Sequence, residues 1–311
     1  MKKKKVGIVG VGNVGSTLAF TLVMKNLCDC ILLKDIRDNF TQAMALDISQ
    51  AASCINSKTI VKAISNDEDF CDCDIIVITA GIPRKPNMSR DDLLFTNAKI
   101  MTSIVKNVIK YNENAIIIIV SNPLDAMVYW ALKASKWKRN KILGMAGVLD
   151  TSRLCHFIKE KVGPKNIKTL VLGGHGDEMI PLINSTTVDD KPLKDFLNDK
   201  EISEIVEKTK NGGIEIVKLL QTGSAYYAPA NSTALMVEAI LKDKKEIFPC
   251  AMKLDGEYGH KDVVIGVPVV LGKNGAETII EKELNDIEKS EFSKSVSSVK
   301  TLIEKLEESS K

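Results

Sequence analysis

Short apolar runs alternate with helical patterns along the first half of the chain. The runs are rich in Val and Ile, and the stretches between them carry apolar residues three and four positions apart. This alternation is typical of βαβ units, whose parallel strands are buried on both faces of the sheet. The expected strands span residues 5–12, 30–36, 59–65, 74–81, 114–122 and 141–147.

The pattern changes near residue 150. Strand patterns at 167–174 and 262–272 now mix with longer helical patterns at 201–221 and 290–310, which indicates an α+β portion. We therefore predict an α/β protein with two parts. A doubly wound parallel sheet (Rossmann domain) would occupy residues 1–146, and an α+β domain carrying the substrate and catalytic groups would occupy residues 147–311.

Composition narrows the classes of partner. A net charge of +3 over 311 residues is too small to suggest nucleic acid, and no run of 18 apolar residues suggests a membrane span. The seven cysteines are odd in number, so reduced thiols are favoured over a disulfide framework. None of the three histidines lies near a CxxC pair, so no metal is expected.

A glycine motif follows the first expected strand. Gly10, Gly12 and Gly15 spell GxGxxG, and a helical pattern over residues 13–25 begins within it. In a dinucleotide site these glycines make a tight turn, let a pyrophosphate approach the backbone, and let helix and strand pack closely. The motif also argues against a secretory signal in "MKKKK" and its apolar sequel, so a cytoplasmic protein is expected.

The next strand ends in a carboxylate. Asp35 lies 20 residues beyond Gly15, where an acidic side chain accepts the ribose hydroxyls of NAD. A 2′-phosphate would meet that carboxylate with like charge, so NAD is predicted over NADP. Arg37 keeps NADP open as an alternative, and a glycine turn without any ligand is the structural alternative.

Candidate chemistry gathers at the expected strand ends, where ligands of doubly wound sheets bind. Each side chain also has a structural explanation, as a solvated arginine, a helix cap or a turn residue. Together they combine an acid/base group, a carboxylate to orient it, an amide and three guanidinium groups. The candidates are Arg84, Arg90, Asn122, Asp150, Arg153 and His175.

A second motif competes with this set. Tyr129 and Lys133 have the YxxxK spacing that short-chain dehydrogenases use for their acid/base tyrosine. The glycine pattern lacks the TGxxxGxG form of those enzymes, and the pair lies on the helix after "SNPLD". We interpret the spacing as a coincidence.

The motifs in order resemble the lactate/malate dehydrogenase family, and within it the malate dehydrogenases of the lactate-dehydrogenase-like type. The resemblance covers essentially the whole chain. It rests on "GIVGVGNVGS", "DIIVITAGIPRKPNMSRDDLL", "VSNPLD", "GVLDTSR", "GGHGDEMIPL", "TGSAYYAPA" and "DGEYGHKDVVIGVPVVLGKNGAE".

The resemblance implies a role for each candidate. His175 would be the acid/base, with Asp150 bonded to its other ring nitrogen. Arg153 would bind the C1 carboxylate of the substrate, and Arg90 and Asn122 would contact the C2 oxygen. NAD contacts would come from the glycine turn, Asp35, the helix after the arginine loop and one strand end, at Gly10, Val11, Gly12, Asn13, Val14, Gly15, Asp35, Asn97, Val120, Ser121 and Asn122.

Arg84 would select the substrate. Family members that use lactate carry glutamine at this position, and those that use malate carry arginine. An arginine enclosed with pyruvate would lack a partner for its charge, whereas oxaloacetate supplies one. The resemblance therefore implies NAD-dependent conversion of (S)-malate to oxaloacetate by a homodimer or homotetramer. A lactate or other 2-hydroxyacid dehydrogenase, and a nucleotide-binding protein without turnover, are the alternatives.

Overall fold

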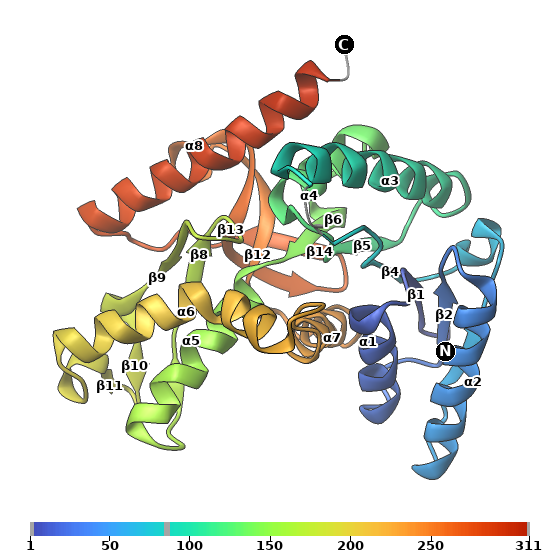
Figure 1. Cartoon of the computed structure of the whole chain (residues 1–311), viewed down its shortest axis with the longest axis horizontal. Coiled ribbons are helices and arrows are strands. Elements are labelled where there is room, and N and C mark those ends of the chain that lie inside the picture. The colour runs from blue at the N-terminus through green and yellow to red at the C-terminus, as the bar shows by residue number, and fades with distance from the viewer. Residues whose placement is uncertain (1–2, 84–87, 310–311) are drawn as a thin grey trace.

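The computed structural model describes residues 3–83 and 88–309. An 11-stranded sheet runs through the molecule, and helices pack on it (Figure 1). The helices are α1 (Asn13–Met24), α2 (Asp38–Cys54), α3 (Arg90–Tyr111), α4 (Leu124–Ser135), α5 (Gly147–Val162), α6 (Asp199–Leu220), α7 (Tyr227–Leu241) and α8 (Asp286–Glu308). None of the described helices is long and apolar enough to cross a membrane.

The first six strands confirm the predicted doubly wound sheet. They pair in parallel in the order β3-β2-β1-β4-β5-β6, so the strand order reverses between β1 and β4. Their aliphatic side chains are almost all buried, as a parallel sheet covered on both faces requires. The strands are β1 (Lys5–Val9), β2 (Cys30–Lys34), β3 (Ile60–Ala63), β4 (Ile75–Ile78), β5 (Ile116–Ile119) and β6 (Ile142–Met145).

Antiparallel strands extend the same sheet in the second half. β12 (Glu246–Asp255) pairs with β6 on one side and with β13 (Lys261–Gly272) on the other. β8 (Val171–Gly173) then pairs with β13 and with β9 (Met179–Pro181). The sheet is thus continuous across residue 146, and the domain boundary placed there stays a prediction.

The remaining strands are short. β14 (Gly275–Ile279) pairs with β13, and a small separate sheet holds β7 (Ile167–Lys168), β10 (Thr187–Val188) and β11 (Lys191–Pro192). The prediction of a single strand over 167–174 is therefore wrong. This segment is divided into β7 and β8, which belong to different sheets.

A capping box at "SRDD" begins α3. The Ser89 hydroxyl accepts the Asp92 backbone N–H, and the Asp92 carboxylate accepts the Ser89 backbone N–H. This capping box satisfies amide groups that the first helical turn leaves without a partner. It begins the helix at Arg90, one of the candidate arginines.

One buried carboxylate connects α7 to α1. The side chain of Glu238 is 11% exposed and lies 2.7 Å from Lys25 Nζ, 3.0 Å from Lys242 Nζ and 3.2 Å from Lys244 Nζ. The hydrogen bonds from Lys25 and Lys242 lower the pKa of Glu238 to about 2, against burial, which alone would raise it. The ionised carboxylate therefore stabilises the contact between the two helices.

We expect Glu238→Gln to lower the free energy of unfolding at pH 7 by about 1 kcal/mol, since the lysines are partly exposed and water screens the pairs. Because the folded pKa lies below the usual value, this stability is present above pH 4.5 and is lost as the pH falls toward 2. The difference between wild type and variant in urea unfolding should therefore shrink between pH 5 and pH 3. Glu246→Gln, at a half-exposed carboxylate 3.5 Å from Lys244, is the control and should change little. A difference independent of pH would contradict the assignment.

Candidate active site

The glycine turn lies between β1 and α1, at the reversal of strand order. Gly10 has a φ of +95°, and a Cβ there would lie 2.5 Å from the Ala80 backbone nitrogen. A Cβ on Gly15 would lie 2.0 Å from the Gly10 carbonyl oxygen. A Cβ on Gly12 would meet no atom within 4 Å. Packing therefore requires two of the glycines, and the third leaves the backbone open to a ligand.

The first turn of α1 directly follows Gly12. Among the described residues no side chain caps the amide groups that begin this helix at Asn13 and Val14. Such amides and the helix dipole favour a bound phosphate. The backbone N–H of Val11 donates to Asp35 Oδ2 at 2.8 Å, so the carboxylate expected at the ribose lies beside the turn. These residues fit the pyrophosphate and ribose of a dinucleotide.

Arg37 folds back onto Asp35. Its Nε donates to Asp35 Oδ1 at 3.0 Å and its Nη2 to Oδ2 at 3.3 Å. Burial raises the pKa of Asp35, but the hydrogen bonds from Arg37 and Val11 outweigh it and lower the pKa overall. The carboxylate is therefore ionised at neutral pH, as repulsion of a 2′-phosphate requires.

Two buried polar side chains connect the ends of β4 and β5. Asn97 is 3% exposed, and its Nδ2 donates to the Asn122 carbonyl at 2.7 Å while its Oδ1 accepts the Ile82 N–H at 2.9 Å. Ser121, next to Val120 after β5, donates its hydroxyl to the Ala80 carbonyl at 2.6 Å. Asn97 thus holds the segment that carries the exposed Asn122, and its own contact with a cofactor stays a prediction.

Of the two arginines Arg84 and Arg90, the structure describes only Arg90. Arg84 lies outside the described residues. Arg90 is the first residue of α3 and is exposed, and it forms no ion pair with residues 3–83 or 88–309. No contact within those ranges joins Arg90 to His175. Its approach to a substrate stays a prediction.

Three candidates from two elements meet at one carboxylate. Asp150 lies in the first turn of α5 and is 1% exposed. Its Oδ2 lies 2.9 Å from Nδ1 of His175, which follows β8, and its Oδ1 accepts Nη1–H of Arg153 at 3.3 Å. A histidine whose Nδ1 is bonded to a carboxylate has its Nε2 available for proton transfer.

The carboxylates around His175 oppose the effect of burial on its pKa. Burial lowers the pKa of His175, but the Asp150 carboxylate, with a smaller effect from Asp125, raises it above its ordinary value. Arg153 acts in the opposite direction. The surrounding charges therefore stabilise the imidazolium and increase the proton affinity of the ring.

Sequence reasoning missed two features of the site. The backbone N–H of His175 donates to Oδ2 of Asp125, at 2.9 Å, from the first turn of α4. In α6, a Cβ on Gly213 would lie 3.1 Å from Nη2 of Arg153, so this glycine lets the guanidinium pack against the helix. The adjacent Gly212 and Gly213 were a usable signal, because each costs about 1 kcal/mol relative to alanine inside a helix.

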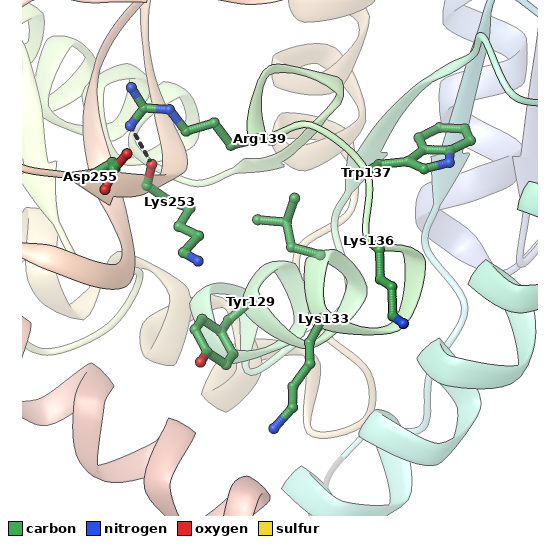
Figure 2. A pocket seen from close by; sticks show the side chains of 8 residues that line it. Tyr129, Lys133, Lys136, Trp137, Arg139, Lys253 and Asp255 are labelled. Atoms are coloured by element: carbon green, nitrogen blue, oxygen red, sulfur yellow. Dashed lines mark hydrogen bonds between the residues drawn. The ribbon is translucent and has the colours of Figure 1, made fainter.

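The YxxxK pair lines a cavity that none of the described candidate site residues lines. Figure 2 shows Tyr129 and Lys133 of α4 beside a cavity of about 430 Å³ that Arg139 and Lys253 also line. The Tyr129 hydroxyl donates to Glu307 at 3.0 Å. Burial and this carboxylate raise the pKa of Tyr129 to about 12. A raised pKa does not suit an acid/base tyrosine, which supports interpreting the spacing as a coincidence.

The Asp35–Arg37 pair predicts a change of cofactor preference in Asp35→Ser. The substitution removes the charge that repels a 2′-phosphate and leaves Arg37 available to bind it. We expect the ratio of the NADPH to NADH dissociation constants to fall by about tenfold or more, which corresponds to 1.4 kcal/mol. Titration of nicotinamide fluorescence measures both constants. Asp38→Ser, at an exposed neighbouring carboxylate, is the matched control, and an equal change there would contradict the role of Asp35.

Comparison with known proteins identifies the family of this chain. Residues 4–144 match the model for the lactate/malate dehydrogenase NAD binding domain, and residues 147–310 match that for the family's alpha/beta C-terminal domain. A malate dehydrogenase of Aliarcobacter butzleri is 63% identical over 309 residues, 99% of this chain and 98% of that protein.

Solved structures are similar over the whole fold. The malate dehydrogenase of Cryptosporidium parvum has a TM-score of 0.95 at 44% identity, covering 99% of this chain and 100% of that one. The lactate dehydrogenase of the same organism, complexed with lactic acid and NAD, has a TM-score of 0.95 at 38% identity, covering 99% of both chains. The chain therefore belongs to the lactate/malate dehydrogenase family of NAD-dependent enzymes.

Proposed function

We propose that this chain is a malate dehydrogenase, which interconverts (S)-malate and oxaloacetate with NAD. The observation that carries the proposal is the bridge at Asp150, whose two carboxylate oxygens hold His175 and Arg153. Asp150 thereby holds the proposed base, His175, next to Arg153, the cation that would bind a carboxylate of the substrate. The 63% identity to the Aliarcobacter butzleri enzyme supports malate as the substrate.

The hydrogen bonding of the His175 ring determines which nitrogen accepts the proton. Bound NAD+ supplies the acceptor for the hydride that leaves C2 of malate. His175 donates Nδ1–H to Asp150, so the lone pair on Nε2 takes the hydroxyl proton as the hydride departs. Asp150 fixes this tautomer and stabilises the imidazolium. In the reverse direction His175 returns the proton to the carbonyl oxygen.

The substrate is positioned by cations and an amide. Arg153, held by Asp150 and packed against Gly213, binds the C1 carboxylate with its planar pair of donors. Arg90 and Asn122 contact the C2 oxygen, where negative charge develops during reduction. The roles of Arg90 and Asn122 rest on the resemblance of their motifs to the family.

The fold alone does not choose between malate and lactate. A malate and a lactate dehydrogenase of Cryptosporidium parvum have the same TM-score of 0.95 to this chain. The choice is assigned to Arg84, whose charge pairs with the second carboxylate of oxaloacetate. Pyruvate carries a methyl group there and would leave the guanidinium without a partner.

Steady-state oxidation of NADH with oxaloacetate and with pyruvate tests the proposal. We expect kcat/KM to favour oxaloacetate by about 10² or more, since an unpaired enclosed charge costs several kcal/mol. Arg84→Gln should lower kcat/KM for oxaloacetate and raise it for pyruvate. Lys85→Gln, which removes a neighbouring charge, is the control and should leave the ratio unchanged. A ratio near one would favour a broader 2-hydroxyacid dehydrogenase, and no turnover of either would favour a nucleotide-binding protein without activity.

The same proposal includes a homo-oligomer, either a dimer or a tetramer. Apolar side chains are exposed on three neighbouring helices, at Phe20 of α1 (41%), Leu46 of α2 (62%) and Leu235 of α7 (41%). A second copy covering these helices would bury them. We also propose a cytoplasmic location, which the odd number of cysteines supports.

Light scattering after size exclusion measures the oligomeric state. We expect wild type to elute with the mass of a dimer or tetramer. Leu235→Glu should reduce that mass, because it places a charge among the exposed apolar side chains. Ile287→Glu, at an apolar residue of α8 that is 73% exposed, is the control. A monomeric wild type would contradict the oligomer.

A further inference from the structure

A second buried carboxylate lies behind the histidine. Asp125 is 6% exposed and accepts the His175 backbone N–H on Oδ2 at 2.9 Å. Its other oxygen, Oδ1, is fully enclosed and has no hydrogen-bond partner among the described residues. A buried carboxylate with one unpaired oxygen is costly, so a structural hydrogen bond alone is a poor explanation for it. The proton transfer described above makes no use of this group.

The segment around His175 is held from two sides. The N–H of Gly174 donates to the Ser295 hydroxyl at 2.8 Å, and the next N–H, that of His175, donates to Asp125. A Cβ on Gly174 would lie 3.3 Å from Ser295 Oγ and 3.5 Å from Asp125 Oδ2. One neutral and one ionisable side chain therefore hold adjacent peptide groups.

The charge of Asp125 is set by its surroundings. Burial raises its pKa to about 6, the N–H and charge of His175 lower it, and Asp150 raises it. The first turn of α4 also favours a negative charge at this position. Asp125 is therefore largely ionised at pH 7 to 8. Among the described residues, the charged groups with the largest effect on His175 are Asp150, Asp125 and Arg153.

We propose that Asp125 is a positioning residue for the proton transfer, which holds the His175 segment through its backbone and places a second negative charge behind the imidazole. The inference rests on the proposed function, since it concerns the histidine of that reaction. Asp150 fixes the ring directly. Asp125 acts on the same ring through its charge.

Asp125→Asn separates the charge from the hydrogen bond. The amide oxygen of asparagine still accepts the His175 N–H, while the negative charge is removed. Loss of that charge destabilises the imidazolium, so the pKa of His175 should fall on the order of one unit, the size of a Coulomb effect through protein. A neutral His175 is needed to oxidise malate and a protonated one to reduce oxaloacetate. The midpoints of both pH profiles of kcat/KM should therefore move to lower pH.

Ser295→Ala is the matched control. It removes the hydrogen bond to the adjacent peptide N–H and leaves the charges in place. We expect it to leave both pH midpoints unmoved, whatever it does to kcat. If Asp125→Asn also leaves them unmoved, or if both variants shift them equally, Asp125 has only a structural role and the proposal is overturned.

A second readout does not depend on the substrate. The chain has three histidines, so an NMR titration of labelled histidine follows His175 directly in the protein without substrate. The titration midpoint should be lower in Asp125→Asn than in wild type, and equal midpoints would overturn the proposal. Failure of wild type to reduce oxaloacetate would instead remove the proposed function and leave this titration interpretable. Should Asp125→Asn fail to fold by circular dichroism, Asp125→Ser also removes the charge. Because it loses the hydrogen bond as well, its midpoint is compared with that of Ser295→Ala, which loses a neighbouring hydrogen bond and keeps the charge.

Discussion

The site depends on one buried carboxylate that has to be paired. Asp150 is 1% exposed, and a charge so enclosed is tolerated only where partners neutralise it. Its partners are His175 on one oxygen and Arg153 on the other, so the same charge orients the imidazole and holds the guanidinium. The glycines of α6 complete the arrangement, because a side chain at Gly213 would crowd the guanidinium.

The continuous sheet brings these partners together. Asp150 and Arg153 begin α5, directly after β6, whereas His175 follows β8. β12 and β13 lie between β6 and β8, and each pairs with its neighbour in the sheet. The parallel half therefore positions the glycine turn, and its antiparallel extension positions the histidine relative to Asp150 (Figure 1).

Charge balance explains why the pKa of a buried histidine is raised here. Burial disfavours the imidazolium, and two carboxylates, Asp150 and Asp125, compensate for it, while Arg153 opposes them. The cost of enclosing Asp125 with an unpaired oxygen is understandable if its charge contributes to this balance. Enclosing Asp125 lowers the stability of the fold, and its charge in return raises the proton affinity of His175.

Local patterns in the sequence determined much of this protein. The six parallel strands, the turn at Gly10 to Gly15 and the cap at Ser89 were all predictable, because each depends on residues close together in the chain. Tertiary structure alone decided the contact of Asp125 with His175, 50 residues apart, and the division of the strand over 167–174 between two sheets. Such features depend on which surfaces pack together, and no local periodicity encodes that choice.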